Sequence, residues 1–293
     1  MPKTYNRIKL IDVERFIWDS KKMNDLQASQ LRWHKDTKED LPYDREEIKE
    51  IREKLFVNDN DRLRAPDVIY NYNNREILSI LECGNDPMSF ANHLEIFHSR
   101  KLAFHQLELN EDQEGIIIGH LLNEYTIVSK PRQLGTSTAI RVAALFEAIF
   151  QKRSVTIATF KETNALHQYD MMLDLYRSLP YYLKPGVILS AEKRKIKFDN
   201  GAQIIFSSVA RLGGHTPDTL MVDNMPRESF RYLMNLILTM LCRTNSRILI
   251  CDTGMEHEIT ETVYRNLMNG IETEFTFDTY ECEWEKVDPN YRE

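Results

Sequence analysis

The sequence predicts an α/β fold with a mostly parallel sheet and helices on both of its faces. Short apolar segments with strand character alternate with longer segments whose apolar residues recur at helical spacing, and this alternation is typical of parallel sheets. The chain has 293 residues, of which 42% are hydrophobic, so it can bury a sizeable core. Ligands of such sheets bind beyond the carboxyl ends of the strands, where we therefore expect a functional site.

The first part of the chain differs from the rest. Residues 44–54 form a highly charged run that is typical of a solvated helix with ion pairs four residues apart. A cluster of turn-forming residues follows at 58–61. We expect residues 1–84 to form a charged helical appendage, which is either a family-specific extension or an arm that docks a partner, and residues 85–293 to form one domain.

From residue 85 onward, the expected helices and strands follow one another along the chain. Helices are expected over residues 90–104, 113–122, 137–152, 164–178 and 227–241. Strands are expected over residues 125–129, 155–159, 219–223, 247–252 and 273–279. Residues 195–198 and 203–207 predict a hairpin that turns at Asp199-Asn200-Gly201.

Composition and charge exclude several classes of protein. The net charge of −7 disfavours a protein that coats nucleic acid through a broad basic surface. The four cysteines form no CxxC pair, which is typical of reduced thiols in the cytoplasm. The amino terminus lacks the apolar stretch of a signal peptide, and the longest apolar run is far shorter than the roughly 20 residues that span a bilayer. We expect a cytosolic protein.

The loop at residues 129–138 is the strongest candidate for a phosphate-binding loop. It joins an expected strand to an expected helix, where backbone N–H groups and the helix N-terminus point at an anion. Against the pattern GxxxxGK[ST], Gly135 and Ser137 fit, but Thr136 stands at the lysine position and Lys130 at the first glycine. The same residues also suit an ordinary turn and helix cap, so the loop alone leaves both interpretations open.

Further polar residues follow at the spacing of a nucleotide-binding fold. The segment TLMVD, which ends at Asp223, matches a Walker B strand, whose aspartate orients Mg²⁺. The next residue is Asn224, where a glutamate normally activates water; an amide can orient that water but cannot accept its proton. Gln113 lies before the loop, where its amide could read adenine. Each feature alone is also typical of turns or surfaces, but their order predicts nucleotide binding.

The segment RQLGTST at Arg132–Thr138 closely resembles the loop RQLGKTT of phage terminase large subunits, the DNA-packaging motors of tailed phages. The resemblance covers residues 85–293. Residues 109–113 are similar to the adenine-site segment of that family, and residues 179–186 and 196–201 are similar to a run found in T4-type enzymes.

The resemblance implies a RecA-like ATPase core of the additional-strand P-loop class, with ATP and Mg²⁺ as cofactors. Ser137 and Asp223 would hold Mg²⁺. Arg132 would contact the γ-phosphate as a finger, Asp223 and Asn224 would be catalytic, and Thr253 falls on the family's coupling motif. The nucleotide-binding residues would be Gln113, Lys130, Arg132, Gln133, Leu134, Gly135, Thr136, Ser137 and Thr138.

The resemblance also implies a function and partners. The chain would couple ATP hydrolysis to translocation of double-stranded DNA into a prohead, as a ring of subunits on the portal protein, together with a small terminase subunit, in the host cytoplasm. The chain ends about where the family's linker to a nuclease domain begins, so we expect no nuclease activity.

Two alternatives remain open on the sequence. Because Thr136 and Asn224 depart from the family pattern, the chain could be a catalytically degenerate nucleotide-binding protein with a structural or regulatory role. A helicase is less favoured, because the aspartate strand continues as VDNM and not as a DExx box. Candidates for contact with DNA are Arg194, Lys195, Lys197 and Arg211.

Overall fold

A computed structural model of the chain describes residues 54–60, 62–98, 103–129, 134–191, 193–212, 217–223, 240, 245–252 and 278–281. Within them, an eight-stranded sheet has the order β10-β3-β9-β8-β4-β7-β6-β5. Its strands are β3 (Tyr125–Ser129), β4 (Ser154–Thr159), β5 (Val187–Leu189), β6 (Lys195–Phe198), β7 (Gln203–Ser208), β8 (Thr219–Asp223), β9 (Arg247–Asp252) and β10 (Asp278–Glu281).

The sheet is parallel over most of its width. Strands β10, β3, β9, β8, β4 and β7 pair in parallel, whereas β6 and β5 continue the sheet antiparallel at one edge. The predicted α/β class with a mostly parallel sheet is therefore confirmed. The expected hairpin is also present, since β6 and β7 pair antiparallel and Gly201 turns between them with a φ of 90°.

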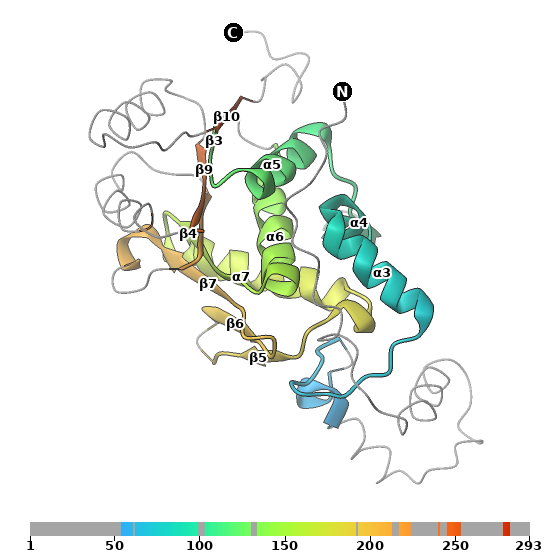
Figure 1. Cartoon of the computed structure of the whole chain (residues 1–293). Helices are drawn as coiled ribbons and strands as arrows, with labels where there is room; N and C mark the ends of the chain where they lie inside the picture. Colours follow the sequence, from blue (N-terminus) through green and yellow to red (C-terminus); the bar gives the residue numbers. More distant parts are fainter. Residues whose placement is uncertain are drawn as a thin grey trace, which may run out of the picture.

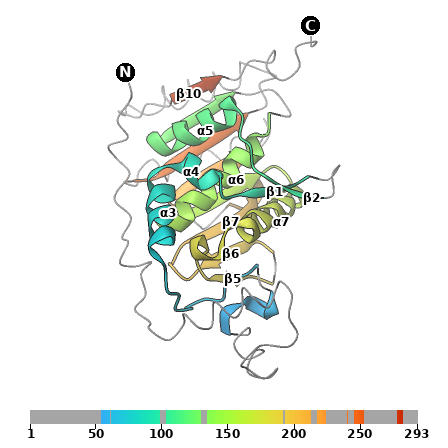
Figure 2. The same ribbon diagram turned by 90° about the vertical axis from the view of Figure 1, so that its right-hand side faces the viewer.

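The described helices that pack on the sheet cover one of its faces (Figures 1 and 2). They are α5 (Glu111–Leu122), α6 (Thr136–Phe146) and α7 (Glu162–Ser178), and α6 continues into a π-helical turn at Glu147–Gln151. Right-handed crossovers from β3 to β4 and from β4 to β7 place α6 and α7 on the same side. The helix expected over residues 227–241 lies outside the described residues. Among the described helices, none combines the length and hydropathy that a bilayer crossing requires.

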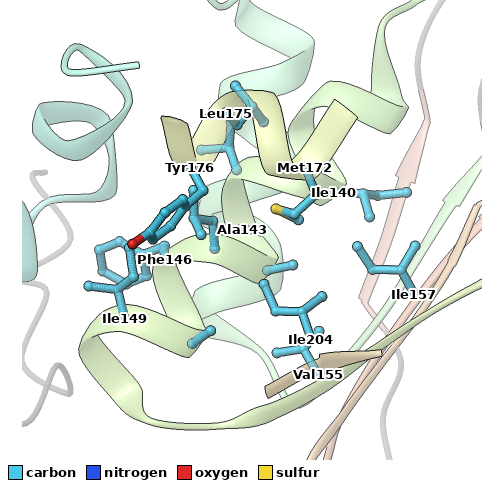
Figure 3. Packing of buried hydrophobic residues seen from close by; sticks show 14 of the residues in the cluster. Ile140, Ala143, Phe146, Ile149, Val155, Ile157, Met172, Leu175, Tyr176 and Ile204 are labelled. Atoms are coloured by element: carbon cyan, nitrogen blue, oxygen red, sulfur yellow. The ribbon is translucent and has the colours of Figure 1, made fainter. Parts of the chain in front are cut away.

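The hydrophobic core lies between this helical layer and the sheet (Figure 3). Helix α6 is almost entirely buried because its residues are nearly all small or apolar, which lets it lie between α5, α7 and the strands. Each large apolar side chain that is fully buried stabilises the fold by roughly 1.5–3 kcal/mol. The central members of the core are Ile140, Phe146, Ile149, Val155, Ile157, Met172, Tyr176 and Ile204.

The single helix predicted over residues 90–104 is wrong. A short helix, α4 (Pro87–Ala91), ends there, and a hairpin of β1 (Glu95–His98) and β2 (Ala103–Gln106) follows. Asp86 caps α4 and Pro87 occupies its first turn, so the helix begins earlier than the apolar spacing suggested. The backbone hydrogen bonds of the hairpin stabilise an extended conformation here, although the apolar residues also fit helical spacing. The Leu107 N–H extends the hairpin by donating to the Leu94 carbonyl at 2.8 Å.

Residues 54–72 form a strap that packs against the antiparallel end of the sheet. Arg64 holds it there, because its guanidinium donates to the carbonyls of Val68 (2.9 Å) and Lys184 (3.0 Å) and lies over the ring of Tyr181. Helix α3 (Asn74–Asn85) follows, with a capping box formed by Asn73 and Glu76. Buried residues of the strap and of α3 belong to the same core as α6: Leu63, Ile80 and Cys83.

Candidate functional site

The carboxyl ends of the central strands lie level with one another at one edge of the sheet. In the pairing register, Ser129 of β3 lies opposite Asp252 of β9, and Asp223 of β8 lies opposite both Cys251 of β9 and Thr159 of β4. Strand β3 leads towards α6, whose N-terminus therefore lies at the same edge. The segments predicted to bind phosphate and metal thus converge, although they are far apart in the sequence.

Gly135 begins helix α6 in the left-handed region, with a φ of 76°. Glycine adopts this conformation without the steric cost that a Cβ imposes. The space beside Gly135 is also filled, since a Cβ added there would overlap Nε2 of Gln113. Gly135 therefore satisfies two requirements of a close-packed loop: a left-handed turn, and an approach of backbone to a neighbouring side chain.

Gln113 lies directly behind this loop, with both ends of its side-chain amide engaged. Its Nε2 donates to the Gly135 carbonyl at 3.0 Å, and its Oε1 accepts from the Asn110 N–H at 3.0 Å in a capping box at the start of α5. In this arrangement Gln113 supports the loop. Its predicted contact with adenine would have to replace these hydrogen bonds, and it stays a prediction.

Ser137 and Asp223 form the central contact of the site. Ser137 Oγ donates to Asp223 Oδ2 at 2.6 Å, which joins the first turn of α6 to the end of β8 across 86 residues of sequence. Asp223 is only 3% exposed. A hydroxyl and a carboxylate that meet at the N-terminus of a helix are the ligand types that Mg²⁺ takes from a phosphate-binding site.

Two buried residues that the sequence analysis did not single out complete the surroundings of Asp223. Gln168 of α7 donates from Nε2 to Asp223 Oδ2 at 2.8 Å. Arg141 of α6 donates to Gln168 Oε1 at 2.7 Å and to Thr138 Oγ1 at 3.1 Å. One signal for Arg141 was present in the sequence, because it is the only charged residue of α6 and follows Ser137 by four positions, which places both on one helix face.

Thr136, at the position of the P-loop lysine, points into the protein. Its side chain is 1% exposed, and its hydroxyl has no hydrogen-bond partner among the described residues. The first helical position therefore supplies no cation to a phosphate. Leu134, just before the turn, is buried in the core.

Several predicted site residues lie outside the described residues, namely Lys130, Arg132, Gln133, Asn224 and Thr253. Their roles stay predictions. The described members of the predicted nucleotide site, from Leu134 to Thr138, lie together at the start of α6 with Gln113 behind them and Asp223 opposite.

The basic residues predicted to contact DNA are partly neutralised. Arg194 and Arg211 both pair with Glu162 at the start of α7, at 2.9 and 3.3 Å. Lys197 is exposed on β6, and Lys195 is half-buried. These residues lie on and around the β6–β7 hairpin, with Arg194 and Arg211 towards the edge where β8 ends.

The side chains at this site suit Mg²⁺ better than they suit a metal ion whose ligands all come from the protein. Within the described ranges, no group of three or more His, Cys, Asp or Glu side chains is placed to hold a metal ion. Magnesium usually takes one or two protein oxygens and completes its octahedron with phosphates and water. One hydroxyl and one carboxylate beside a glycine turn therefore fit a magnesium ion that arrives with a phosphate ligand.

Comparisons with known proteins found similar solved structures but no similar sequence. No family model and no curated protein matches the chain. The bacteriophage HK97 large terminase is similar to 67% of this chain, with a TM-score of 0.54 and 10% identity. The ATPase domain of the Thermus phage P74-26 large terminase has a TM-score of 0.49 at 17% identity, covering 62% of this chain and 84% of that one. For the UvsW helicase of bacteriophage T4, the TM-score is 0.47 at 13% identity, with 67% of each chain covered.

The likeness to the HK97 large terminase has a defined extent. This chain spans 43% of that enzyme's length, and at 10% identity the likeness concerns the fold alone. The mostly parallel sheet agrees with the fold class predicted from the sequence. The chain therefore has a RecA-like fold with a mostly parallel sheet, similar over the matched residues to that of the HK97 large terminase.

Proposed function

We propose that this chain is the ATPase domain of a phage DNA-packaging terminase large subunit. In this proposal it couples binding and hydrolysis of ATP to translocation of double-stranded DNA into a prohead. It would act as a ring of identical subunits docked on a portal protein, with a small terminase subunit as a further partner, in the host cytoplasm. The T4-type sequence run at residues 179–186 and 196–201 supports the T4-type branch of the family.

The observation that carries the proposal is the contact between Ser137 and Asp223. A serine at the start of a helix after a left-handed glycine, joined to an aspartate that ends a neighbouring parallel strand, is the arrangement that binds a magnesium–nucleotide complex. When bound, Mg²⁺ would neutralise charge on the phosphate oxygens. The Ser137 hydroxyl and the Asp223 carboxylate would be the side chains that hold this ion.

The other residues of the site take roles in binding and orientation. The N-terminus of α6 presents its free N–H groups to the phosphates, because the first turn of a helix has no intrahelical acceptors. Lys130 and Arg132 would supply the positive charge that Thr136 does not supply. Asn224 would orient the attacking water, and Thr253 would link the site to movement of a neighbouring part of the motor.

A titration with a fluorescent ATP analogue tests the proposal. The unmodified chain is expected to bind the analogue in the presence of Mg²⁺. Ser137→Ala and Asp223→Asn are expected to weaken the Mg²⁺-dependent part of binding by roughly tenfold or more, because the first removes a metal ligand and the second removes the negative charge of one. Ser154→Ala is the matched control, since its hydroxyl accepts a hydrogen bond from Gln203 at the opposite edge of the sheet. Failure of the unmodified chain to bind the analogue would contradict the proposal.

Strand separation distinguishes this motor from a helicase with a related fold. A motor that moves intact double-stranded DNA is expected to leave a tailed duplex paired in the presence of ATP. Release of the labelled strand would instead indicate a helicase.

The catalytically degenerate alternative also has an observation in its favour. Thr136 is buried at the lysine position, and Asn224 stands where a general base is expected. If the site binds ATP but lacks a base, Asn224→Glu is expected to raise steady-state phosphate release at least tenfold, within the range by which a positioned base accelerates such reactions. A parent chain that already turns over rapidly would rule out the degenerate site, because its base would then come from elsewhere.

A further inference from the structure

We infer that Gln168 and Arg141 are positioning residues for Asp223, and that they set the affinity of the site for its divalent cation. This inference rests on the proposed function and extends it to two residues outside the phosphate loop and the aspartate strand. Both are buried and both come from helices. Gln168 is hydrogen-bonded to Asp223 directly, and Arg141 is connected to Asp223 through its hydrogen bond to Gln168.

The hydrogen bonds form a continuous path through three elements, from Ser137 to its neighbour in sequence, Thr138. Ser137 of α6 and Gln168 of α7 both donate to the same oxygen of Asp223 on β8, at 2.6 and 2.8 Å. Arg141, one turn after Ser137 on α6, donates to Gln168 at 2.7 Å and returns the path to Thr138 at 3.1 Å. The carboxylate is thus held from two helices.

Arg141 decides which way the Gln168 amide faces. A guanidinium can only donate hydrogen bonds, so the amide atom next to it has to be the acceptor, Oε1. The donor, Nε2, is then directed at Asp223. Without Arg141, the amide of Gln168 could rotate and present its oxygen to the carboxylate, which would repel it.

Burial makes this arrangement selective for one geometry. Gln168 and Arg141 are each 6% exposed, so water competes little with the hydrogen bonds. Desolvation lowers the pKa of Arg141 to about 10, against the opposing effect of Asp223, so its guanidinium stays charged at neutral pH. If the buried guanidinium of Arg141 lost Gln168 as its acceptor, the fold would be destabilised, and this favours the intact path of hydrogen bonds.

The consequence for metal binding follows from the geometry that Mg²⁺ requires. Magnesium accepts little departure from octahedral coordination. Asp223 would therefore have to present its oxygen to the ion in a fixed direction. Gln168 fixes the carboxylate independently of Ser137, because its hydrogen bond to Asp223 does not involve the serine.

The test measures the Mg²⁺ concentration at half-maximal binding of a fluorescent ATP analogue, with the analogue fixed and Mg²⁺ titrated. Gln168→Leu and Arg141→Met are each expected to raise this midpoint roughly tenfold, the usual effect of losing a partner that orients a metal ligand. Binding of the analogue in excess chelator is expected to stay unchanged. A structural defect would instead lower both kinds of binding.

A double variant shows whether Arg141 acts through Gln168. The variant with both substitutions is expected to have the same Mg²⁺ midpoint as Gln168→Leu alone, since the effects of substitutions on one path are not additive. Gln203→Leu is the control, because this glutamine donates to Ser154 at the opposite edge of the sheet. Its midpoint is expected to match that of the unmodified chain. Independent, additive shifts of the two single variants would contradict the path.

Folding is followed by thermal unfolding of every variant. If Gln168→Leu does not fold, Arg141→Lys replaces it, because lysine keeps the charge but cannot donate to Gln168 and Thr138 through one planar group. A midpoint that Arg141→Lys leaves unchanged would overturn the inference while leaving the proposed function intact. If the unmodified chain binds no analogue with or without Mg²⁺, the proposed function fails, and the inference fails with it.

Discussion

At the residue scale, two glycines of the described chain share a left-handed backbone but differ in their surroundings. Gly135 starts α6 and has Gln113 beside it, whereas a Cβ at Gly201, in the β6–β7 turn, would meet nothing within 4 Å. The pair therefore separates the cost of the backbone conformation from the cost of crowding at the candidate site.

Gly135→Ala is expected to cost more stability than Gly201→Ala, and to weaken binding of the ATP analogue. In both variants, an alanine in the left-handed region destabilises the fold by on the order of 1–3 kcal/mol. Only Gly135→Ala also displaces Gln113 from the loop. Urea unfolding measures the first difference, and the analogue titration measures the second. Equal losses of stability, with no change in binding by either variant, would show that Gln113 moves aside without consequence.

At the element scale, the π-helical turn that ends α6 holds a buried carboxylate at the opposite edge of the sheet. Glu147 lies 2.6 Å from Arg247 Nη1, 3.4 Å from His120 Nε2 and 3.8 Å from Arg153 Nε. Burial alone would raise the pKa of Glu147, but His120, Arg247 and Arg153 together lower it to about 2. This cluster joins α5 and α6 to the starts of β4 and β9.

The depressed pKa predicts how stability depends on pH. A glutamate in the unfolded chain has a pKa of about 4.3. Glu147 therefore stabilises the fold fully above that pH and loses its contribution as the pH falls towards about 2. Glu147→Gln is expected to cost roughly 3–5 kcal/mol at pH 7, because it removes a buried carboxylate and leaves the partly buried Arg153 and Arg247 without their counterion.

Urea unfolding between pH 7 and pH 2 tests this prediction. Below about pH 4, the free energy of unfolding of Glu147→Gln should also change less with pH than that of the unmodified chain. Asp174→Asn, which removes a partly exposed pair with Arg177, serves as the control and should cost less than about 1 kcal/mol. If the free energy of unfolding of Glu147→Gln depended on pH as steeply as that of the unmodified chain, the acid sensitivity would come from other groups.

At the scale of the whole molecule, the strap of residues 54–72 closes over the antiparallel end of the sheet. Gly186 allows this approach, since a Cβ there would overlap Ala65, Pro66 and Asp199. The division at residue 84 predicted from the sequence stays a prediction. Leu63 and Ile80, which precede it, are buried in the same core as α6.

Arg64→Met is expected to loosen the strap without unfolding the sheet. It removes the hydrogen bonds to Val68 and Lys184, so backbone amides of the strap should exchange with solvent at least tenfold faster, which corresponds to about 1.4 kcal/mol of local opening. Amides of β3 and α6 should keep their protection. Hydrogen exchange measures both, and Arg75→Met, an exposed arginine at the start of α3, is the control. Uniformly faster exchange would show that the strap and the sheet open as one unit.

The sequence predicted those parts of the molecule whose signals are local. Strands β3 and β8 are short runs of apolar and β-branched residues that end in a polar residue, and their bounds follow from that pattern. The hairpin β1–β2 escaped because its apolar residues also fit helical spacing, and only long-range pairing decides between the two. Gln168 escaped for a similar reason: on α7 alone its polar side chain resembles a solvent-facing one, and only the fold brings it to Asp223.

Helix α7 connects the arginines beside the β6–β7 hairpin to the buried carboxylate of Asp223. Glu162, at its start, holds Arg194 and Arg211, and Gln168 follows less than two helical turns later. A polyanion that drew these arginines away from Glu162 would act on the same rigid helix that holds the Asp223 carboxylate. Thermodynamic linkage is reciprocal, so such a polyanion and the divalent cation would each change the affinity for the other by the same factor.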